Sequence, residues 1–316
     1  MVGVNAVKNE ILKLLPPCIR YIINQIDIDY NSLIELRFRI CEPLILVFTQ
    51  GEYFVQNCGG LTLDRKKAYR VTADDIRGII DAVTDYSLYA YEDEVRQGFV
   101  TVCGGHRVGV AGQVVLEHGR VRNVKHISFI NIRVSHQIKG CATCLLPYVI
   151  KDGRLLHTLI ISPPGCGKTT ILRDLVRLIS DGNSYCRGMN VGVVDERSEL
   201  AACYMGIPPN DVGLRTDILD GCPKAEGMLM LLRSMSPKVI AVDEIGSRED
   251  IDAISYVINC GCGILATIHG DSIDDIRTRP VLRKLVEEKV FERYIVLGRS
   301  AGIGTVESIF DERGNE

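Results

Sequence analysis

The sequence of 316 residues predicts an α/β fold, with a mostly parallel sheet in residues 151–316 and a smaller α+β N-terminal domain in residues 1–150. From residue 155 onward, short apolar runs alternate with stretches of helical periodicity, a pattern typical of βαβ units. In the first half, strand-like alternation and hairpin signals favour antiparallel strands. The length by itself suggests two domains, each large enough for a core.

The elements expected in the first domain follow from proline, capping and turn signals. In chain order they are an amphipathic helix stopped by Pro16–Pro17, two short antiparallel strands in 34–48, a helix in 71–97 capped by Thr72, a hairpin in 99–115 turning near Gly104–Gly105, and a strand in 127–135. Residues 151–154 are expected to be a linker. The strands expected after it are HTLIIS, VGVVD, VIAVD and ILATIH, with helices between them.

The stretch SPPGCGKTT, residues 162–170, resembles the phosphate-binding pattern G-x-x-x-x-G-K-[ST], except that its first position is Ser162. It lies between an expected buried strand and an expected helix, so backbone N–H groups and the helix N-terminus would face a bound phosphate. The residues expected to bind the nucleotide are Ser162, Pro163, Pro164, Gly165, Cys166, Gly167, Lys168, Thr169 and Thr170. Lys168 can reach the β- and γ-phosphates, and the Thr169 hydroxyl is placed for Mg²⁺. Serine at position 162 is tolerated if its φ is negative.

Three further strands end in polar groups. VIAVD runs into Asp243 and Glu244, a position from which Asp243 can hold Mg²⁺ and Glu244 can activate a water molecule. VGVVDERSEL supplies Asp195 and Glu196, and ILATIH ends on His269, which could sense the γ-phosphate. Because ligands bind at the carboxyl ends of strands in α/β sheets, these groups together predict a nucleotide hydrolase that uses ATP and Mg²⁺.

The composition limits the kinds of partner that the chain is expected to bind. With 37 basic and 40 acidic side chains the formal charge is −3, and no basic stripe with aromatic residues favours nucleic acid. No apolar run has the length of a membrane span, and the N-terminus lacks the pattern of a signal peptide. Membrane contact is therefore expected to be indirect. The 12 cysteines are expected to be reduced and to pack as small apolar residues rather than to bind metal.

The series formed by the phosphate loop, VVDERSEL, VIAVDEIGSRED and ATIHGDS resembles the secretion-system ATPases of the type II and type IV families. The stretches RTDILDGCPKAEGM and GFVTVCGGHRVGVAGQV are similar to a branch of that superfamily found in endospore-forming bacteria. The resemblance implies a RecA-like ATPase domain and a hexameric ring on the cytoplasmic face of a membrane. It further implies that the ring energises a channel between mother cell and forespore, together with integral membrane proteins.

The resemblance also implies roles for individual residues, and the chain differs from the usual motifs of these ATPases at some positions. It implies that arginines of the N-terminal domain complete the site, which would fall on Arg133 and, more weakly, on Arg107. Secretion ATPases usually have Gly-Glu at the end of the Walker B strand, with an arginine two residues on, whereas this chain has Asp243–Glu244 and then Gly246. Its acidic box is inverted, so either Asp195 or Glu196 could face the nucleotide.

Two other functions stay open on the sequence. A nucleotide-bound scaffold would bind ATP and hydrolyse it very slowly, and Glu244 argues against it. A small-molecule phosphotransferase would need an acceptor site, and the sequence contains no lid-like arginine cluster.

Overall fold

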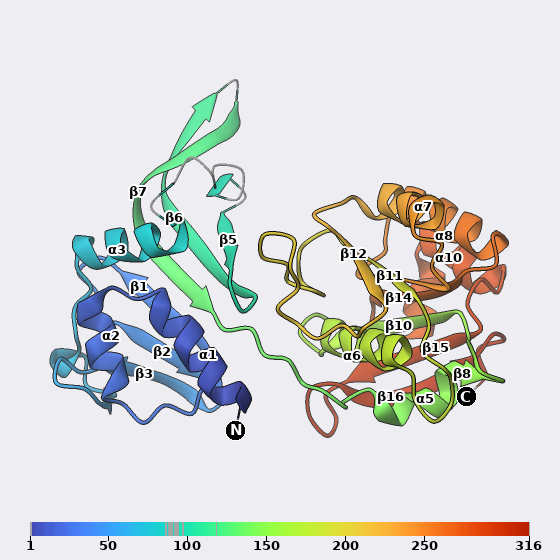
Figure 1. The fold of residues 1–316 in the computed structure, drawn as a ribbon, viewed down its shortest axis with the longest axis horizontal. Coiled ribbons are helices and arrows are strands. Elements are labelled where there is room, and N and C mark those ends of the chain that lie inside the picture. The colour runs from blue at the N-terminus through green and yellow to red at the C-terminus, as the bar shows by residue number, and fades with distance from the viewer. Residues whose placement is uncertain are drawn as a thin grey trace. The chain divides into compact units, whose positions relative to one another are not determined.

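The computed structural model describes residues 2–85, 87, 91, 95–96, 98–117 and 119–315 (Figure 1). The chain divides into two compact units, Met1–His136 and Gln137–Glu316. Each unit has a seven-stranded sheet.

The first unit packs helices on one face of an antiparallel sheet with the order β4-β3-β2-β1-β7-β6-β5. Its elements are α1 (Val2–Lys13), α2 (Pro17–Asn24), β1 (Leu33–Arg39), β2 (Ile45–Phe48), β3 (Gly51–Val55), β4 (Leu61–Thr62), α3 (Ala73–Val83), β5 (Phe99–Val102), β6 (His106–Glu117) and β7 (Arg120–Arg133). Leu15, Ile19 and Ile76 from the three helices share one core with Phe38 and Leu46 of the sheet. The unit is therefore α+β, as the sequence predicts.

Most expected elements of this unit are present. Thr72 caps α3 in a capping box with Asp75, and β5 and β6 form the expected hairpin. Two details differ. Helix α3 ends at Val83 instead of continuing to residue 97; residues 86, 88–90, 92–94 and 97 of the predicted helix lie outside the described residues. The proline pair that stops α1 also begins α2, because proline fits the first turn of a helix.

The second unit is a mostly parallel sheet with the order β12-β11-β13-β14-β10-β15-β16, in which only the last pair is antiparallel. Its elements are α5 (Leu146–Val149), β8 (Ile150–Lys151), β9 (Arg154–Leu155), β10 (Thr158–Ser162), α6 (Lys168–Asp181), β11 (Val191–Asp195), β12 (Thr216–Asp220), α7 (Lys224–Ser234), β13 (Val239–Val242), α8 (Arg248–Asn259), β14 (Gly263–His269), α9 (Ile273–Thr278), α10 (Pro280–Glu287), β15 (Arg293–Gly298) and β16 (Thr305–Asp311).

Helices cover both faces of this sheet (Figure 1). Leu172 and Leu175 of α6 pack on one face, while helices α7 to α10 pack on the other through residues such as Leu231 and Ile254. The central strands β10, β11 and β13 are buried along their whole length, which explains why they are continuous apolar runs in the sequence.

The boundary between the units lies earlier than expected. Residues 137–150 belong to the second unit, because Ala142, Leu145 and Val149 are part of its core and the Ala142 N–H donates to Asp174 of α6 at 2.9 Å. Residues 151–154 are not a linker. They belong to the β8–β9 hairpin: Lys151 pairs with Arg154, and Asp152 and Gly153 form the turn with φ values of 52° and 75°. Asp-Gly favours a tight hairpin turn of this kind.

Candidate nucleotide-binding site

The phosphate loop joins β10 to α6 as the sequence predicts. Gly165 and Gly167 have φ values of 69° and 81°, a left-handed conformation that glycine adopts without strain. Ser162 is the last residue of β10 and pairs in register with His269, so its backbone is extended and needs no glycine. The loop can therefore form with serine at its first position.

Two oxygen groups suited to Mg²⁺ meet beside the loop. The Thr169 hydroxyl donates to Oδ2 of Asp243 at 2.6 Å, and the Thr267 hydroxyl donates to the other carboxylate oxygen. Burial raises the pKa of Asp243, and the two hydroxyl hydrogen bonds oppose this rise. The sequence predicts Thr169 and Asp243 as the metal ligands, and the fold brings both to one point.

Glu244 lies at the centre of a charged cluster. Its carboxylate accepts a hydrogen bond from Nζ of Lys168 at 2.6 Å and one from Nη1 of Arg197 at 2.6 Å, and Nε2 of His269 lies 2.8 Å away. Burial raises the pKa of this carboxyl, but the hydrogen bond and charge of Lys168, with the charges of His269 and Arg197, outweigh it and hold the pKa below its ordinary value.

The backbone at Glu244 is held in an uncommon conformation. Its φ is 55°, and the Thr267 hydroxyl accepts its N–H at 2.8 Å. A left-handed non-glycine residue costs of order 1 kcal/mol or more and is found preferentially at functional sites. Thr267, which is fully buried, thus fixes both Asp243 and Glu244.

The two carboxylates of the acidic box have different surroundings. Asp195 is buried and accepts the backbone N–H groups of Glu199 and Ala201, both at 2.8 Å, so it shapes the loop after β11. Glu196 is exposed, pairs with Lys224, and lines a small cavity with Asp243 and Glu244. Asp195 lines the same cavity, so both carboxylates border the candidate site, Asp195 with its oxygens bonded to the backbone and Glu196 paired with a lysine.

His269 and Arg133 have distinct positions. His269 ends β14, and its Nε2 lies 3.3 Å from Nζ of Lys168, while its Nδ1 is buried without a hydrogen-bond partner. Arg133 ends β7 in the first unit; its side chain is 69% exposed and its Nε lies 3.5 Å from Glu35. Arg107, in the same unit, stacks over the ring of Phe99 at 4.2 Å. The roles expected for both arginines stay predictions.

Three residues at this site were missed from the sequence. They are Thr267, which holds Asp243 and Glu244, Arg197, which pairs with Glu244, and Arg299, which donates to the carbonyl of Pro164 in the phosphate loop at 3.2 Å. Arg197 lies within the acidic box DERSEL, and that position was the available signal. Thr267 and Arg299 have no local pattern that distinguishes them.

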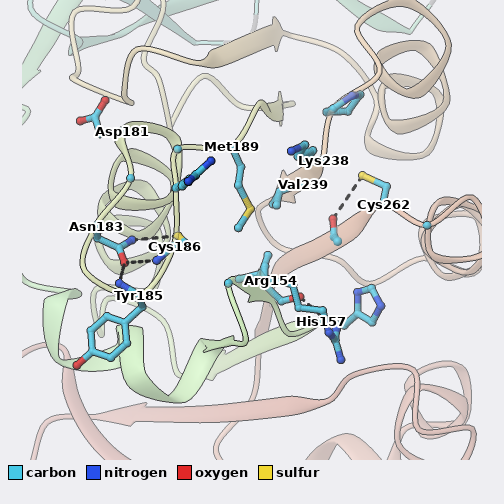
Figure 2. Close-up of a pocket in the computed structure, with 18 of the residues that line it drawn as sticks. Arg154, His157, Asp181, Asn183, Tyr185, Cys186, Met189, Lys238, Val239 and Cys262 are labelled. Carbon is cyan, nitrogen blue, oxygen red and sulfur yellow. Dashed lines mark hydrogen bonds between the residues drawn. The ribbon is translucent and has the colours of Figure 1, made fainter.

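A separate cavity of about 1550 Å³ lies at the opposite end of the parallel strands from the phosphate loop (Figure 2). It is lined by loops at the amino ends of the parallel strands, including Arg154, Asn183, Cys186 and Lys238. Ligands of α/β sheets bind at the carboxyl ends of the strands. The candidate nucleotide site therefore lies at the carboxyl ends, beside Lys168 and Asp243, and the large volume of this other cavity does not identify it as the nucleotide site.

The cysteines differ from the expectation. All twelve are free thiols, but only Cys166, Cys186, Cys203 and Cys262 are buried, and six are exposed. Packing in the core thus explains a minority of them. Among the described residues, no group of three or more His, Cys, Asp or Glu side chains could hold a metal ion.

The residues present fit a nucleotide with Mg²⁺. The left-handed glycines leave the loop without side chains where phosphate oxygens would lie, Lys168 supplies a cation, and Thr169 with Asp243 supplies a hydroxyl and a carboxylate. The unpartnered Nδ1 of His269 is a further polar group at this place.

Comparison with known proteins agrees with this geometry. The family model described as "Sporulation stage III, protein AA" matches residues 5–316. The chain belongs to this family. Stage III sporulation protein AA of Bacillus subtilis (strain 168) is 42% identical over 308 residues, which cover 97% of this chain and 96% of that protein.

Solved structures resemble the chain at the level of the fold. The ATPase DotB of Legionella pneumophila superposes with a TM-score of 0.56 at 13% identity, over 84% of this chain and 72% of DotB. The pilus retraction motor PilT, solved with bound ADP, superposes with a TM-score of 0.56 at 14% identity, over 91% of this chain and 77% of PilT. These likenesses confirm the predicted RecA-like fold of this sporulation stage III protein AA family member.

Proposed function

We propose that this chain is an ATP-hydrolysing subunit of a motor that energises a membrane channel between mother cell and forespore during endospore formation. The observation that supports this best is a single cluster at the carboxyl ends of β10, β13 and β14. There Lys168 is bonded to the Glu244 carboxylate and Thr169 to the Asp243 carboxylate, and Thr267 bonds both Asp243 and the Glu244 backbone. Family membership supports the setting in sporulation.

Binding rests on Lys168 and the loop. The Lys168 side chain is 7% exposed, and the residue begins α6 directly after the loop. Its ammonium group would contact the β- and γ-phosphates of ATP together with the backbone N–H groups. Thr169 and Asp243 would hold Mg²⁺, which neutralises the charge on the transferred phosphoryl group when it is bound. Glu196, through its exposed carboxylate, could orient the nucleophile or contact the metal through water.

Hydrolysis rests on Glu244. Lys168 cannot hold its full contact with both Glu244 and a triphosphate, so we expect it to move to the phosphates and leave Oε1 of Glu244 beside Nε2 of His269 alone. That oxygen would take a proton from water as the water oxygen bonds to the γ-phosphorus. The bond between the γ-phosphorus and the bridging oxygen breaks, and ADP leaves with the electron pair. His269, next to both groups, could report the γ-phosphate.

Assembly and location follow from the same proposal. We propose a homo-oligomeric ring, with a hexamer favoured, in which Arg133 of one subunit completes the site of its neighbour. Among the described residues, no helix is both long and apolar enough to cross a bilayer. We therefore propose a cytoplasmic subunit that reaches the membrane through integral membrane proteins of the channel, without a part for nucleic acid.

The decisive experiment is ATP binding by Lys168→Ala, measured by calorimetry on the full chain. Loss of a charge-assisted contact of this kind, about 1.5–3 kcal/mol, lowers affinity by about tenfold or more. Lys238→Ala, an exposed lysine at the opposite edge of the sheet, is the matched control and should bind ATP as the wild type does. Equal ATP affinity in the two variants would make the loop a structural turn and remove the basis of the proposal.

A further inference from the structure

The position of the phosphate loop in the sheet divides the candidate site into two sides. Strand β10 lies between β14 and β15. The groups suited to Mg²⁺ and water, Asp243, Glu244 and His269, all come from β13 and β14. The γ-phosphate end of a nucleotide therefore belongs on the β14 side, and the base and ribose must extend toward the β15 side.

Arg299 stands on that second side. It directly follows β15, its Nε lies 3.2 Å from Sγ of Cys166, and its Nη2 donates to the Pro164 carbonyl at 3.2 Å. A Cβ atom placed on Gly165 would lie only 2.9 Å from Nη2. Neither partner is a carboxylate, so these contacts orient the guanidinium along the loop without neutralising its charge.

An exposed aliphatic side chain accompanies it. Ile303, in the same β15–β16 connection, is 74% exposed. A Cβ atom placed on Gly167 would lie 3.4 Å from its Cγ2 atom. Hydrogen bonds of the Ser300 N–H to Glu307 and of the Ala301 N–H to Thr305 fix the shape of this connection. A positively charged planar group and an apolar side chain thus border the phosphate loop from one connection.

We propose that the connection formed by residues 299–304 is the base and ribose subsite for a nucleoside triphosphate such as ATP, with the guanidinium of Arg299 stacked on the base and Ile303 against its edge. A guanidinium is planar, weakly hydrated and stacks on aromatic faces. The contacts of Nε and Nη2 with the loop occupy one edge of the Arg299 guanidinium and leave its face available for stacking on a base. The proposal rests on the proposed nucleotide binding, and it adds the recognition of the nucleoside part.

The test compares ATP with inorganic triphosphate, which has the phosphates and lacks the nucleoside. Binding of both is measured by calorimetry for the full-length wild type, Arg299→Ala and Ile303→Ala, with Arg187→Ala as an exposed arginine control at the opposite edge of the sheet. Arg299→Ala should weaken ATP by about five- to one-hundred-fold, the usual worth of stacking on a base, and leave inorganic triphosphate within about twofold. Ile303→Ala should act on ATP in the same direction by a smaller factor.

The outcomes separate the two levels of inference. An equal loss of both ligands in Arg299→Ala would mean that Arg299 only supports the loop or contacts phosphate, and it would overturn the subsite. Unchanged ATP affinity in Arg299→Ala would overturn it too. If the wild type bound neither ligand, the proposed nucleotide binding itself would fail, and the subsite with it.

Discussion

Replacing Glu244 with glutamine tests the chemistry and the ion-pair geometry at once. Glutamine keeps the shape and can still accept a hydrogen bond from Lys168, but it cannot take a proton from water. We therefore expect ATP turnover to fall by about 10²–10⁴-fold, the usual worth of general-base catalysis. ATP and Mg²⁺ should still bind, because the loop, Thr169 and Asp243 are unchanged.

The structure adds a second, opposite effect on binding. Lys168 is bonded to Glu244 at 2.6 Å, and the two side chains are 7% and 15% exposed. To reach a phosphate Lys168 must weaken this contact, and hydrogen bonds between charged groups are worth about 1.5–3 kcal/mol. Removing the charge of residue 244 lowers that cost, so Glu244→Gln should bind ATP up to about ten- to one-hundred-fold more tightly than the wild type.

Single-turnover hydrolysis and calorimetric ATP binding measure the two effects separately. Glu196→Gln is the matched comparison, because Glu196 lines the same cavity but pairs with Lys224 instead of Lys168. It should cost less in turnover, change the Mg²⁺ dependence more, and leave ATP affinity near the wild-type value. A Glu244→Gln enzyme near the wild-type rate beside an inactive Glu196→Gln would reverse the two assignments. Weaker ATP binding by Glu244→Gln would refute the competition for Lys168.

Three other expectations can be checked with the same chain. Mixing Arg133→Ala with Glu244→Gln, each inactive alone, should restore about a quarter of the wild-type rate if sites are shared between neighbours, and no recovery would contradict a shared site. Asp174 accepts the Ala142 N–H and pairs with Arg177, and although burial raises its pKa, these bonds hold it below the ordinary value. The ionised carboxylate stabilises the fold above the unfolded pKa of about 4, and this stabilisation is lost as pH falls through the lower folded pKa. The free energy of unfolding in urea should therefore be about 1.5–3 kcal/mol lower for Asp174→Asn than for the wild type at neutral pH, and the difference should shrink in acid. Ser162→Gly should lower stability by about 0.5–1 kcal/mol without strengthening ATP binding, since the serine backbone is already extended, and a large gain in affinity would show that serine limits the loop.

The parts of the site that the sequence predicts are those encoded within one strand–loop–helix unit. The loop residues up to Thr169, and the pair Asp243–Glu244, follow directly from an apolar run and a polar end. Arg299 could not be found this way, because its contact with Cys166 joins residues 133 positions apart and depends on β15 pairing with β10. A single surface arginine carries no mark of such a contact.

The fold shows the same division between local and non-local information. Class, sheet type and the strands that carry the acidic groups are predicted, because buried parallel strands are continuous apolar runs. Strands β12, β15 and β16 were missed; TDILD of β12 is polar at both ends and only partly buried. The domain boundary was placed too late, because residues 137–150 are assigned to the second unit only by contacts with α6, such as that of Ala142 with Asp174.

The geometry makes β14 the element on which the proposed chemistry depends most. Its Thr267 hydroxyl bonds both Asp243 and the Glu244 backbone, and its last residue, His269, lies against Glu244 and Lys168. The Glu244 backbone is in a left-handed conformation that its neighbours must maintain, and Thr267 accepts its N–H. A small shift of β14 relative to β13 would therefore alter the metal carboxylate and the proposed base together.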